Sequence, residues 1–252
     1  LSILDLSELG HQPMQSESGR FVVIYNGEIY NFREIRQELG CDIVFRGESD
    51  TEILLAAIEK WGLKEAIRRA NGMFALALWD KQTRTLSLAR DRFGQKPLYF
   101  GHAASVFAFA SELKAFGALP SWNRTINRDA LSLYFRHGYI PEPHSIWQGV
   151  RKIEPGTIVT VNPEELIAGK DPVPEHYWDV FDLPARQQSA ISSFGGIVDE
   201  LDTLLQDAIS KCMVSDVPLG AFLSGGIDSS LVVALMQAQS GATVNTFTIG
   251  FS

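Results

Sequence analysis

The alternation of apolar and polar residues is clearest between residues 219 and 236, which have the sequence LGAFLSGGIDSSLVVALM. An apolar run over 219–223 predicts a strand, which stops at Ser224, Gly225 and Gly226. Apolar residues then return at once with helical spacing, which predicts a helix beginning near Ile227. Residues 243–249 predict a second strand. A strand, helix and strand of this length are expected to form a parallel pair with a right-handed crossover.

This topology places the glycine loop at the carboxyl ends of the strands, where open α/β sheets bind ligands. Two adjacent glycines let backbone N–H groups approach an anion, and the following helix directs its positive dipole end to the same point. Ser224, Ser229 and Ser230 add hydroxyl donors. No Gly-Lys-Ser/Thr follows, so the loop differs from a Walker-type phosphate loop. The alternative is a glycine turn before a capped helix, with Asp228 favouring only the helix dipole.

The first part of the chain mixes strands and helices. Residues 21–25 predict a strand that stops at Asn26 and Gly27, a dipeptide that is equally typical of a hairpin turn. Helical spacing follows, with Asn31 and Glu34 in the positions of a helix cap and its reciprocal partner. The sequence therefore favours a strand followed directly by a helix.

A second helix is predicted over residues 50–61, where apolar residues recur at helical spacing. Ser49 and Glu52 have the spacing of a capping box at its start. Asp50 lies in the first turn, where the helix dipole is a sufficient explanation for a carboxylate.

From residue 73 onward the period changes to that of strands, and hairpins are predicted over 73–90 and 98–110. Hairpins of this kind assemble antiparallel sheets. The charged stretch between them, residues 90–97, is typical of a solvated turn with salt bridges. A further strand is predicted over 157–161.

Four prolines interrupt residues 163–195, which have no sustained periodicity and are predicted to form a linker. An amphipathic helix over 197–212 then leads into the glycine loop. The chain is therefore expected to join an α+β domain to the first βαβ unit of an α/β domain.

Composition narrows the class of protein. The 252 residues are 45% hydrophobic, as in globular proteins, and a net charge of −8 without a basic run argues against nucleic acid as the main ligand. No apolar run reaches the length of a membrane span and no signal-peptide pattern is present, so no membrane association and a cytoplasmic location are expected. Cys41 and Cys212 lack metal-binding spacing and are predicted to be buried thiols.

Several segments resemble motifs of one family, in the expected order. They are residues 1–6 (LSILDL), 10–14 (GHQPM), 25–31 (YNGEIYN), 49–52 (SDTE), 72–75 (GMFA), 90–99 (RDRFGQKPLY), 110–114 (ASELK) and 224–229 (SGGIDS). The last resembles the signature of the PP-loop ATP pyrophosphatases, and the whole chain resembles a glutamine-hydrolysing asparagine synthetase. By this resemblance, residues 1–162 form a type 2 glutamine amidotransferase domain, residues 163–195 form the linker, and residues 196–252 form the start of the synthetase ATP-binding domain. The chain is also expected to be cut at both ends.

The resemblance implies an N-terminal-nucleophile type sandwich, with antiparallel sheets between helices, followed by the first βαβ unit of an α/β PP-loop ATP pyrophosphatase domain. It implies that the Asn26 side-chain amide and the Gly27 N–H form an oxyanion hole. Asp50 would pair with the α-amino group of glutamine. The glutamine-binding residues it implies are Leu1, Ser2, Ile3, Leu4, Asn26, Gly27, Glu28 and Asp50.

For the second domain, the resemblance implies ATP binding with adenine contacts from the backbone near Phe222 and Ile249. The ATP-binding residues it implies are Phe222, Leu223, Ser224, Gly225, Gly226, Ile227, Asp228, Ser229, Ser230 and Ile249. Mg²⁺ would bridge the phosphates with Asp228 as the local ligand. Ammonia released from glutamine would displace AMP from β-aspartyl-AMP, itself formed from aspartate and ATP with release of pyrophosphate, to give asparagine. A homodimer through the amidotransferase domains is also implied.

Such enzymes use a cysteine thiol at the mature N-terminus, whereas Cys41 and Cys212 are internal. The 252-residue chain alone is therefore expected to lack glutaminase activity. One alternative is an asparagine synthetase-like amidotransferase, or a β-lactam synthetase, that acts on another carboxylate. A second is a non-catalytic nucleotide-binding module. A third, a PP-loop enzyme acting on tRNA, is disfavoured by the acidic charge.

Overall fold

The computed structural model describes residues 4–103, 106–120, 122, 124–167, 170–183 and 193–250. The chain divides into two units, each held together by its own contacts. The larger unit comprises His11–Arg46 and Asp50–Leu183, and the smaller unit comprises Leu1–Gly10, Gly47–Ser49 and Pro184–Ser252.

The larger unit begins with strands, continues with helices and then returns to strands. Its elements are β1 (Met14–Gln15), β2 (Phe21–Ile29), α1 (Phe32–Leu39), α2 (Asp50–Trp61), α3 (Leu63–Arg69), β3 (Gly72–Asp80), β4 (Thr85–Arg90), β5 (Tyr99–Ala103), β6 (Val106–Ala110), α4 (Leu113–Phe116), α5 (Arg128–His137), β7 (Val150–Lys152), β8 (Thr157–Val161), α6 (Pro163–Ile167), β9 (Pro174–His176) and the 3₁₀ helix η2 (Val180–Asp182).

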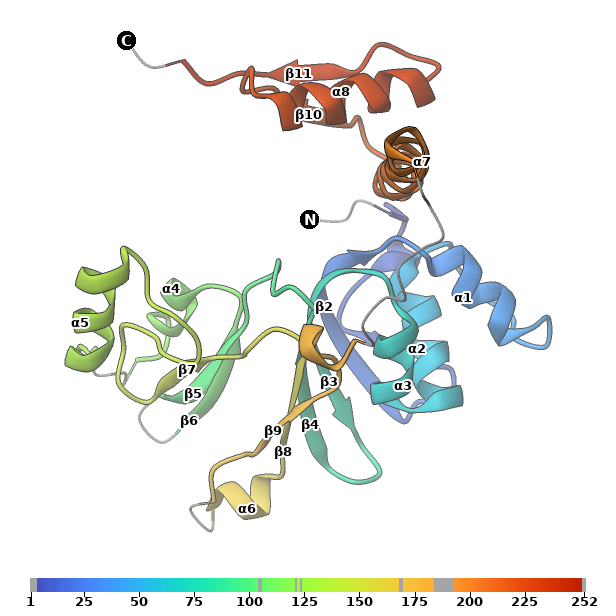
Figure 1. Ribbon diagram of the computed structural model, residues 1–252. Helices are drawn as coiled ribbons and strands as arrows, with labels where there is room; N and C mark the ends of the chain where they lie inside the picture. The colour runs from blue at the N-terminus through green and yellow to red at the C-terminus, as the bar shows by residue number, and fades with distance from the viewer. Residues whose placement is uncertain are drawn as a thin grey trace. The chain divides into compact units, whose positions relative to one another are not determined.

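Two antiparallel sheets form the centre of this unit (Figure 1). Among the described residues, one sheet has six strands in the order β1-β2-β3-β4-β8-β9, and the other has three in the order β6-β5-β7. Helices α1, α2 and α3 lie on one side of the six-stranded sheet, and the three-stranded sheet with α4 and α5 lies on the other (Figure 1). The predicted sandwich of antiparallel sheets between helices is therefore confirmed.

One part of the core lies between the two sheets. Ala77 of β3, Leu88 of β4 and Val159 of β8 cluster with Phe100 of β5, and each of the four is at most 6% exposed. Burial of each large side chain contributes about 1.5–3 kcal/mol. Residues 74–78 of β3 are buried in succession, because helices cover one face of this strand and the second sheet covers the other.

The strand predicted over residues 21–25 does not stop at Asn26 and Gly27 but continues to Ile29. It pairs with β3 along its whole length. The interpretation of Asn-Gly as a strand end or turn is therefore wrong. Pairing with a neighbouring strand outweighs the local turn preference of this dipeptide.

Helix α1 follows as predicted, but the Asn31 side chain makes no capping hydrogen bond. Its Nδ2 donates to Arg69 O at 3.0 Å, and its Oδ1 accepts from Asn71 N at 2.7 Å. Asn31 therefore ties the start of α1 to the connection between α3 and β3.

The region predicted as a linker, residues 163–195, begins inside the larger unit. β9 forms an edge strand on β8, and the buried Tyr177 donates its hydroxyl to Arg90 O at 3.0 Å. The unit consequently continues to Leu183. An edge strand tolerates proline and needs no hydrophobic period, so the sequence pattern did not reveal it.

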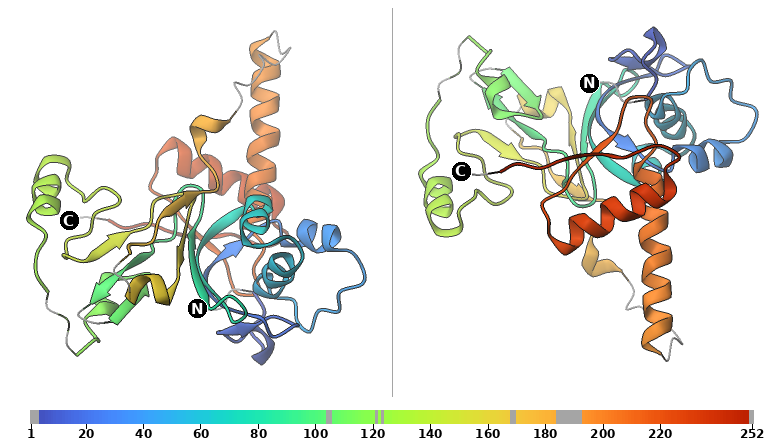
Figure 2. Two further views of the ribbon diagram at one scale, coloured as in Figure 1. Left: turned by 90° about the horizontal axis from the view of Figure 1, so that it is seen from below. Right: turned by 90° about the horizontal axis from the view of Figure 1, so that it is seen from above.

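The smaller unit holds the predicted strand, helix and strand. Its elements are the 3₁₀ helix η1 (Glu8–Gly10), α7 (Phe194–Cys212), β10 (Gly220–Phe222), α8 (Ile227–Gln239) and β11 (Asn245–Phe247). β10 and β11 pair in parallel, with Phe222 opposite Phe247, and α8 connects them (Figure 2). Gln239 Nε2 of α8 donates to Gln206 O of α7 at 3.2 Å. The predicted βαβ unit is confirmed.

Both cysteines differ from the prediction, because Cys41 and Cys212 are exposed. Cys41 follows the end of α1, and Cys212 ends α7, a helix without buried residues. Within the described part of the chain, none of the helices combines the length and apolar character needed to cross a bilayer.

Candidate functional site

The end of β2 carries Asn26, Gly27 and Glu28 at consecutive positions. A Cβ atom on Gly27 would lie 2.2 Å from Met73 O and 2.6 Å from Phe74 Cα, both on β3. No side chain fits at such distances, so the approach of the two backbones requires glycine here.

The hydrogen-bond pattern directs the Gly27 N–H away from β3. Phe74, which lies opposite Gly27, donates its N–H to Asp91 Oδ2 and accepts from Asp91 N, so both of its main-chain groups face the other way. Gly27 and Phe74 are therefore a non-hydrogen-bonded pair, the closer of the two pair types in an antiparallel ladder. The N–H groups on either side that also point away from β3 are occupied. Tyr25 N donates to Gln12 Oε1 at 2.6 Å, and Ile29 N donates to Asp50 Oδ2 at 2.9 Å. Among the described residues, the Gly27 N–H is the outward donor that remains for a ligand.

Two buried carboxylates lie beside this strand end. Asp50, the first residue of α2, is 5% exposed, and Glu28 is 7% exposed. Asp50 Oδ2 accepts from the Tyr25 hydroxyl and from Ile29 N, both at 2.9 Å. Asp50 therefore joins the start of α2 to the end of β2, a role that goes beyond its interaction with the helix dipole.

The electrostatics of this pair favour a positively charged ligand. Burial raises the pKa of Glu28, the charge of Asp50 raises it further, and Lys96 opposes both effects. Burial also raises the pKa of Asp50, against the hydrogen bonds from Ile29 and Tyr25. A bound ammonium group would offset both the desolvation and the mutual repulsion of the carboxylates. The arrangement suits the α-amino group of an amino acid.

The Asn26 side chain has a partner from the other sheet. Its Nδ2 donates to Ser111 Oγ at 3.0 Å. Asn26 belongs to the six-stranded sheet, whereas Ser111 directly follows β6 of the three-stranded sheet. Ser111 was not predicted as a site residue, and its only sequence signal was its place in the ASELK segment. Because 85 residues separate the two positions, the sequence does not indicate that they meet.

The charged stretch 90–97 is only in part the solvated turn with salt bridges that was predicted, because Arg90 and Asp91 are buried. Asp91 is 1% exposed, and its Oδ2 accepts from Phe74 N at 3.1 Å and from Lys96 N at 2.9 Å. Its Oδ1 accepts from two further N–H groups of the loop. Asp91 is buried within the loop because its carboxylate satisfies main-chain donors that would otherwise lack partners, whereas Phe93 of the same loop is 72% exposed.

Arg90 completes this arrangement. It is 6% exposed, and its guanidinium donates to Lys96 O at 2.8 Å, Ile153 O at 2.6 Å and Gly94 O at 2.6 Å. Asp91 thus holds the N–H of Lys96 and Arg90 holds its carbonyl. The same Asp91 carboxylate accepts from Phe74, the residue opposite Gly27.

The structure brings together part of the predicted glutamine-binding set. Asn26, Gly27, Glu28 and Asp50 lie in the larger unit at one strand end. Leu1, Ser2 and Ile3 lie outside the described residues, and Leu4 is described with the smaller unit.

The predicted glycine loop of the smaller unit connects β10 to α8. Gly225 has a φ of +81°, in the left-handed region that favours glycine. Gly226 is the N-cap residue of α8 and offers no side-chain cap, so the N–H groups of the first turn remain available to an anion. A Cβ on Gly226 would lie 3.5 Å from its nearest neighbour, Ser224 Oγ, so protein packing does not require glycine there.

The three serine hydroxyls bond within the loop. Ser229 Oγ and Ser230 Oγ donate to Gly226 O at 3.2 and 2.8 Å. Ser224 Oγ lies 3.0 Å from Ser229 Oγ, and either hydroxyl could be the donor of that pair. That these hydroxyls donate to an anion therefore stays a prediction. A ligand would have to redirect them.

Phe222 and Ile249 lie at the carboxyl ends of the two parallel strands, with side chains 75% and 72% exposed. Leu223 N donates to the main chain of β11 at 2.9 Å, and Thr248 Oγ1 donates to Leu223 O at 2.6 Å. These bonds hold the strand ends, with their exposed main chain, next to the glycine loop.

Asp228 lies in the first turn of α8. The described residues contain no group of three or more His, Cys, Asp or Glu side chains placed to hold a metal ion. A cation at Asp228 would therefore need further ligands from a bound molecule. Mg²⁺ fits this requirement, since it is usually held by one or two carboxylates together with phosphate oxygens and water.

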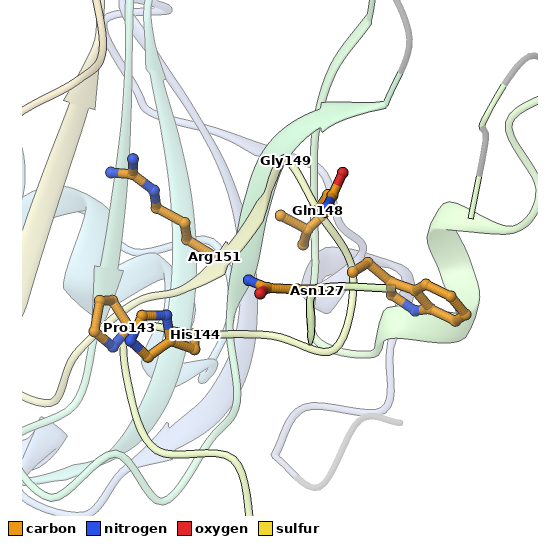
Figure 3. A pocket seen from close by; sticks show the side chains of 8 residues that line it. Asn127, Pro143, His144, Gln148, Gly149 and Arg151 are labelled. Atoms are coloured by element: carbon orange, nitrogen blue, oxygen red, sulfur yellow. The ribbon is translucent and has the colours of Figure 1, made fainter. Parts of the chain in front are cut away.

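A separate hollow of the larger unit contains none of the predicted site residues (Figure 3). Its volume is about 480 Å³. It is lined by Asn127, Pro143, His144, Trp147, Gln148, Gly149, Val150 and Arg151. Asn127 serves there as the cap of α5, accepting from Asp129 N and Ala130 N.

Comparison with protein families gives two matches. The model of the glutamine amidotransferase domain matches residues 1–178, and the model of asparagine synthase matches residues 200–252. The first match covers more than half of the chain.

Two curated relatives extend beyond this chain. It is 35% identical over its whole length to a putative asparagine synthetase [glutamine-hydrolyzing] 2 of Methanocaldococcus jannaschii and covers 50% of it. It is 36% identical over its whole length to asparagine synthetase [glutamine-hydrolyzing] 1 of Bacillus subtilis and covers 38% of it. The chain thus spans half or less of the length of these relatives.

Among solved structures, the chain is similar to the glutamine phosphoribosylpyrophosphate amidotransferase of Bacillus subtilis in complex with ADP and GMP. The match covers 97% of this chain and 49% of the other, with a TM-score of 0.50 and 18% identity. This likeness concerns the fold alone and agrees with the N-terminal-nucleophile type sandwich.

Proposed function

Since the chain belongs to the glutamine amidotransferase domain family, we propose that its larger unit binds glutamine at the end of β2 and releases the side-chain amide as ammonia. The observation that carries the proposal is the buried pair Glu28 and Asp50 beside the outward N–H of Gly27. In the whole protein, the ammonia would serve the ATP-dependent conversion of aspartate to asparagine, the product for which the relatives are named.

Asp50 and Glu28 receive the α-ammonium group of glutamine in this proposal. The Asp50 carboxylate is held by the Tyr25 hydroxyl and by Ile29 N, so it can accept a ligand without reorganising, and the main chain of Glu28 is fixed by pairing with β3. Two acidic groups with raised pKa values gain most from a cationic partner, which supports an amino acid over a neutral amide as the ligand.

Asn26 and Gly27 act as the oxyanion donors. The Gly27 N–H points away from the β3 partner strand, and the Asn26 amide lies one residue before it. Two donors fixed in advance stabilise the negative charge that develops on the amide oxygen, and removal of one such donor typically lowers kcat by about 10²–10³. The main chain of Leu1, Ser2, Ile3 and Leu4 is proposed to help hold the glutamine.

The smaller unit is proposed to bind ATP through the loop from Phe222 to Ser230, with Ile249 beside the adenine. The uncapped first turn of α8 and the left-handed Gly225 support a phosphate site. Mg²⁺ is proposed to take Asp228 as its protein ligand. When bound, the ion supplies charge neutralisation at the phosphates, while the chain's own N–H groups orient them.

Glutamate release from glutamine tests the proposal. We would compare the 252-residue chain with a chain extended at its amino end to the start codon of its gene, because the reaction needs a nucleophilic thiol that Cys41 and Cys212 do not supply at an N-terminus. Activity is expected only in the extended chain. Asp50→Asn in that chain should abolish glutamine binding measured by calorimetry, and Asp207→Asn, a surface carboxylate on α7, is the matched control. Absence of glutamate release from both chains would contradict the proposal.

A further inference from the structure

We infer that Ser111 is a positioning residue that sets the orientation of the Asn26 amide in the oxyanion hole. The inference rests on the proposed function and adds to that site a residue that follows β6 of the three-stranded sheet. It is carried by the hydrogen bond from Asn26 Nδ2 to Ser111 Oγ at 3.0 Å.

The main chain fixes one oxyanion donor but not the other. The Gly27 N–H takes its direction from the β2–β3 ladder. Asn26 shares that ladder, but its side chain is exposed, and its amide can rotate about two side-chain bonds. Something beyond the ladder must therefore orient the Asn26 amide.

The bond to Ser111 provides this orientation. An amide nitrogen carries two protons, and when one points to Ser111 Oγ the other is free to donate to a ligand. Rotation of the amide by half a turn would present Oδ1 instead, and a carbonyl oxygen repels the developing oxyanion. Ser111 Oγ thus holds the amide in place as the acceptor of Nδ2. A hydroxyl could also donate to Oδ1 of a flipped amide, but the developing oxyanion can bond only the N–H groups, so it favours the orientation in which the held amide is a donor.

Ser111 itself is held by the second sheet. It follows Ala110, which pairs with Tyr99 across β5 and β6, and it precedes α4, whose Phe116 is 2% exposed against Val150. The two oxyanion donors are therefore set by different sheets, Gly27 by the six-stranded sheet and Asn26 by the three-stranded sheet through Ser111.

The test uses Ser111→Ala in the extended chain described above, with glutamine turnover and glutamine binding measured separately. An interaction made only in the transition state lowers kcat and leaves KM unchanged. We expect kcat to fall about 10-fold, with KM and the glutamine Kd within about 2-fold of the parent. Ser111→Thr keeps a hydroxyl and should restore kcat to within about 3-fold of the parent. Ser87→Ala, on β4 beside Thr160, is the control and should change neither value.

Three results would overturn the inference. These are a kcat for Ser111→Ala within 2-fold of the parent, a rise in KM that matches the fall in kcat, and a Ser111→Thr variant as slow as Ser111→Ala. If Ser111→Ala does not fold, Ser111→Cys takes its place in the test. Sulfur is a weaker acceptor than oxygen, so the kcat of Ser111→Cys should lie below that of the parent but fall less than the roughly 10-fold expected for Ser111→Ala. An unchanged kcat overturns the inference. A parent without glutaminase activity would overturn the proposed function first, so the two failures are distinguishable.

Discussion

The two units hold their candidate sites in different ways. In the larger unit, the site residues come from β2, α2 and the loop after β4, and buried carboxylates join these distant segments. In the smaller unit, the glycine loop is held by its immediate neighbours, namely β10, β11 and the first turn of α8.

Burial shows the same contrast. The core of the larger unit contains clusters of side chains that are nearly inaccessible to solvent. In α7 and α8 of the smaller unit, by contrast, Met236 is the buried residue, and large apolar side chains such as Leu201 and Leu204 are about half exposed. Because few apolar contacts support it, the glycine loop should open at a lower free-energy cost than the candidate site of the larger unit. Substitutions in the two sites should therefore have very different effects on stability.

Gly27→Ala should give the largest effect. Its Cβ would overlap Met73 O and Phe74 Cα, so the two central strands must separate, at a cost of about 3 kcal/mol in the free energy of unfolding. Gly226→Ala is the matched change in the smaller unit. Its Cβ has 3.5 Å of space and its φ is −74°, so only the preference of the N-cap position for Gly over Ala remains, and the cost should be under about 1 kcal/mol.

Tryptophan fluorescence during denaturant unfolding measures this difference. All five tryptophans, Trp61, Trp79, Trp122, Trp147 and Trp178, belong to the larger unit, so the signal reports on that unit alone. Circular dichroism at 222 nm follows Gly226→Ala. Equal transition midpoints for Gly27→Ala and the parent would show that the strands are not in the close contact described here.

Asp91→Asn should give the second largest effect. The carboxylate accepts main-chain bonds from Phe74, Lys96 and two other residues, and an amide would turn two donor protons toward one pair of these N–H groups. We expect a loss of about 2–3 kcal/mol, measured by the same fluorescence assay. Asp228→Asn, at the exposed start of α8, should cost under about 0.5 kcal/mol. A similar loss for both variants would contradict the contrast between the units.

The same contrast explains which parts were predictable from sequence. The strand, loop and helix around Gly225 are adjacent in sequence, so spacing and glycine placement were enough to predict their fold. The hairpins β3–β4 and β5–β6 were predicted for the same reason. Elements whose partners are adjacent in sequence can be predicted from the local spacing of apolar, polar and glycine residues.

The proposed glutamine site of the larger unit showed almost no such pattern in the sequence. Asn26 and Gly27 suggested a turn, because nothing in the nearby sequence shows that β3 pairs with them. The charged run around Asp91 suggested a fully solvated loop, because the burial of Asp91 depends on the N–H of Phe74, which lies seventeen residues away in the sequence. The position of Ser111 depends on the packing of two sheets. Only the resemblance to a family pointed to these residues before the structure placed them.

The smallest effect should come from an ion pair at the edge of the larger unit, and it depends on pH. Asp80 accepts from Arg20 Nε and Nη2 at 3.0 and 2.7 Å, which holds the pKa of that carboxyl well below its usual range. The folded state therefore binds this proton less readily than the unfolded state. The pair contributes stability above about pH 4 and loses it as the pH falls further, because protonation then favours unfolding.

Asp80→Asn should lower the free energy of unfolding by about 1 kcal/mol at pH 6 and by less at pH 3. The stability of the variant should therefore fall less steeply on acidification than the stability of the parent. Glu28 and Asp50, with raised pKa values, act in the opposite direction in both proteins and cancel in the comparison. Asp207→Asn removes the exposed pair with Lys211 in the smaller unit and should leave the fluorescence-detected stability unchanged at both pH values. Parallel pH dependences for Asp80→Asn and the parent would mean that solvent screens the Arg20 pair as fully as the Lys211 pair. The contrast between the units would then be confined to their buried groups.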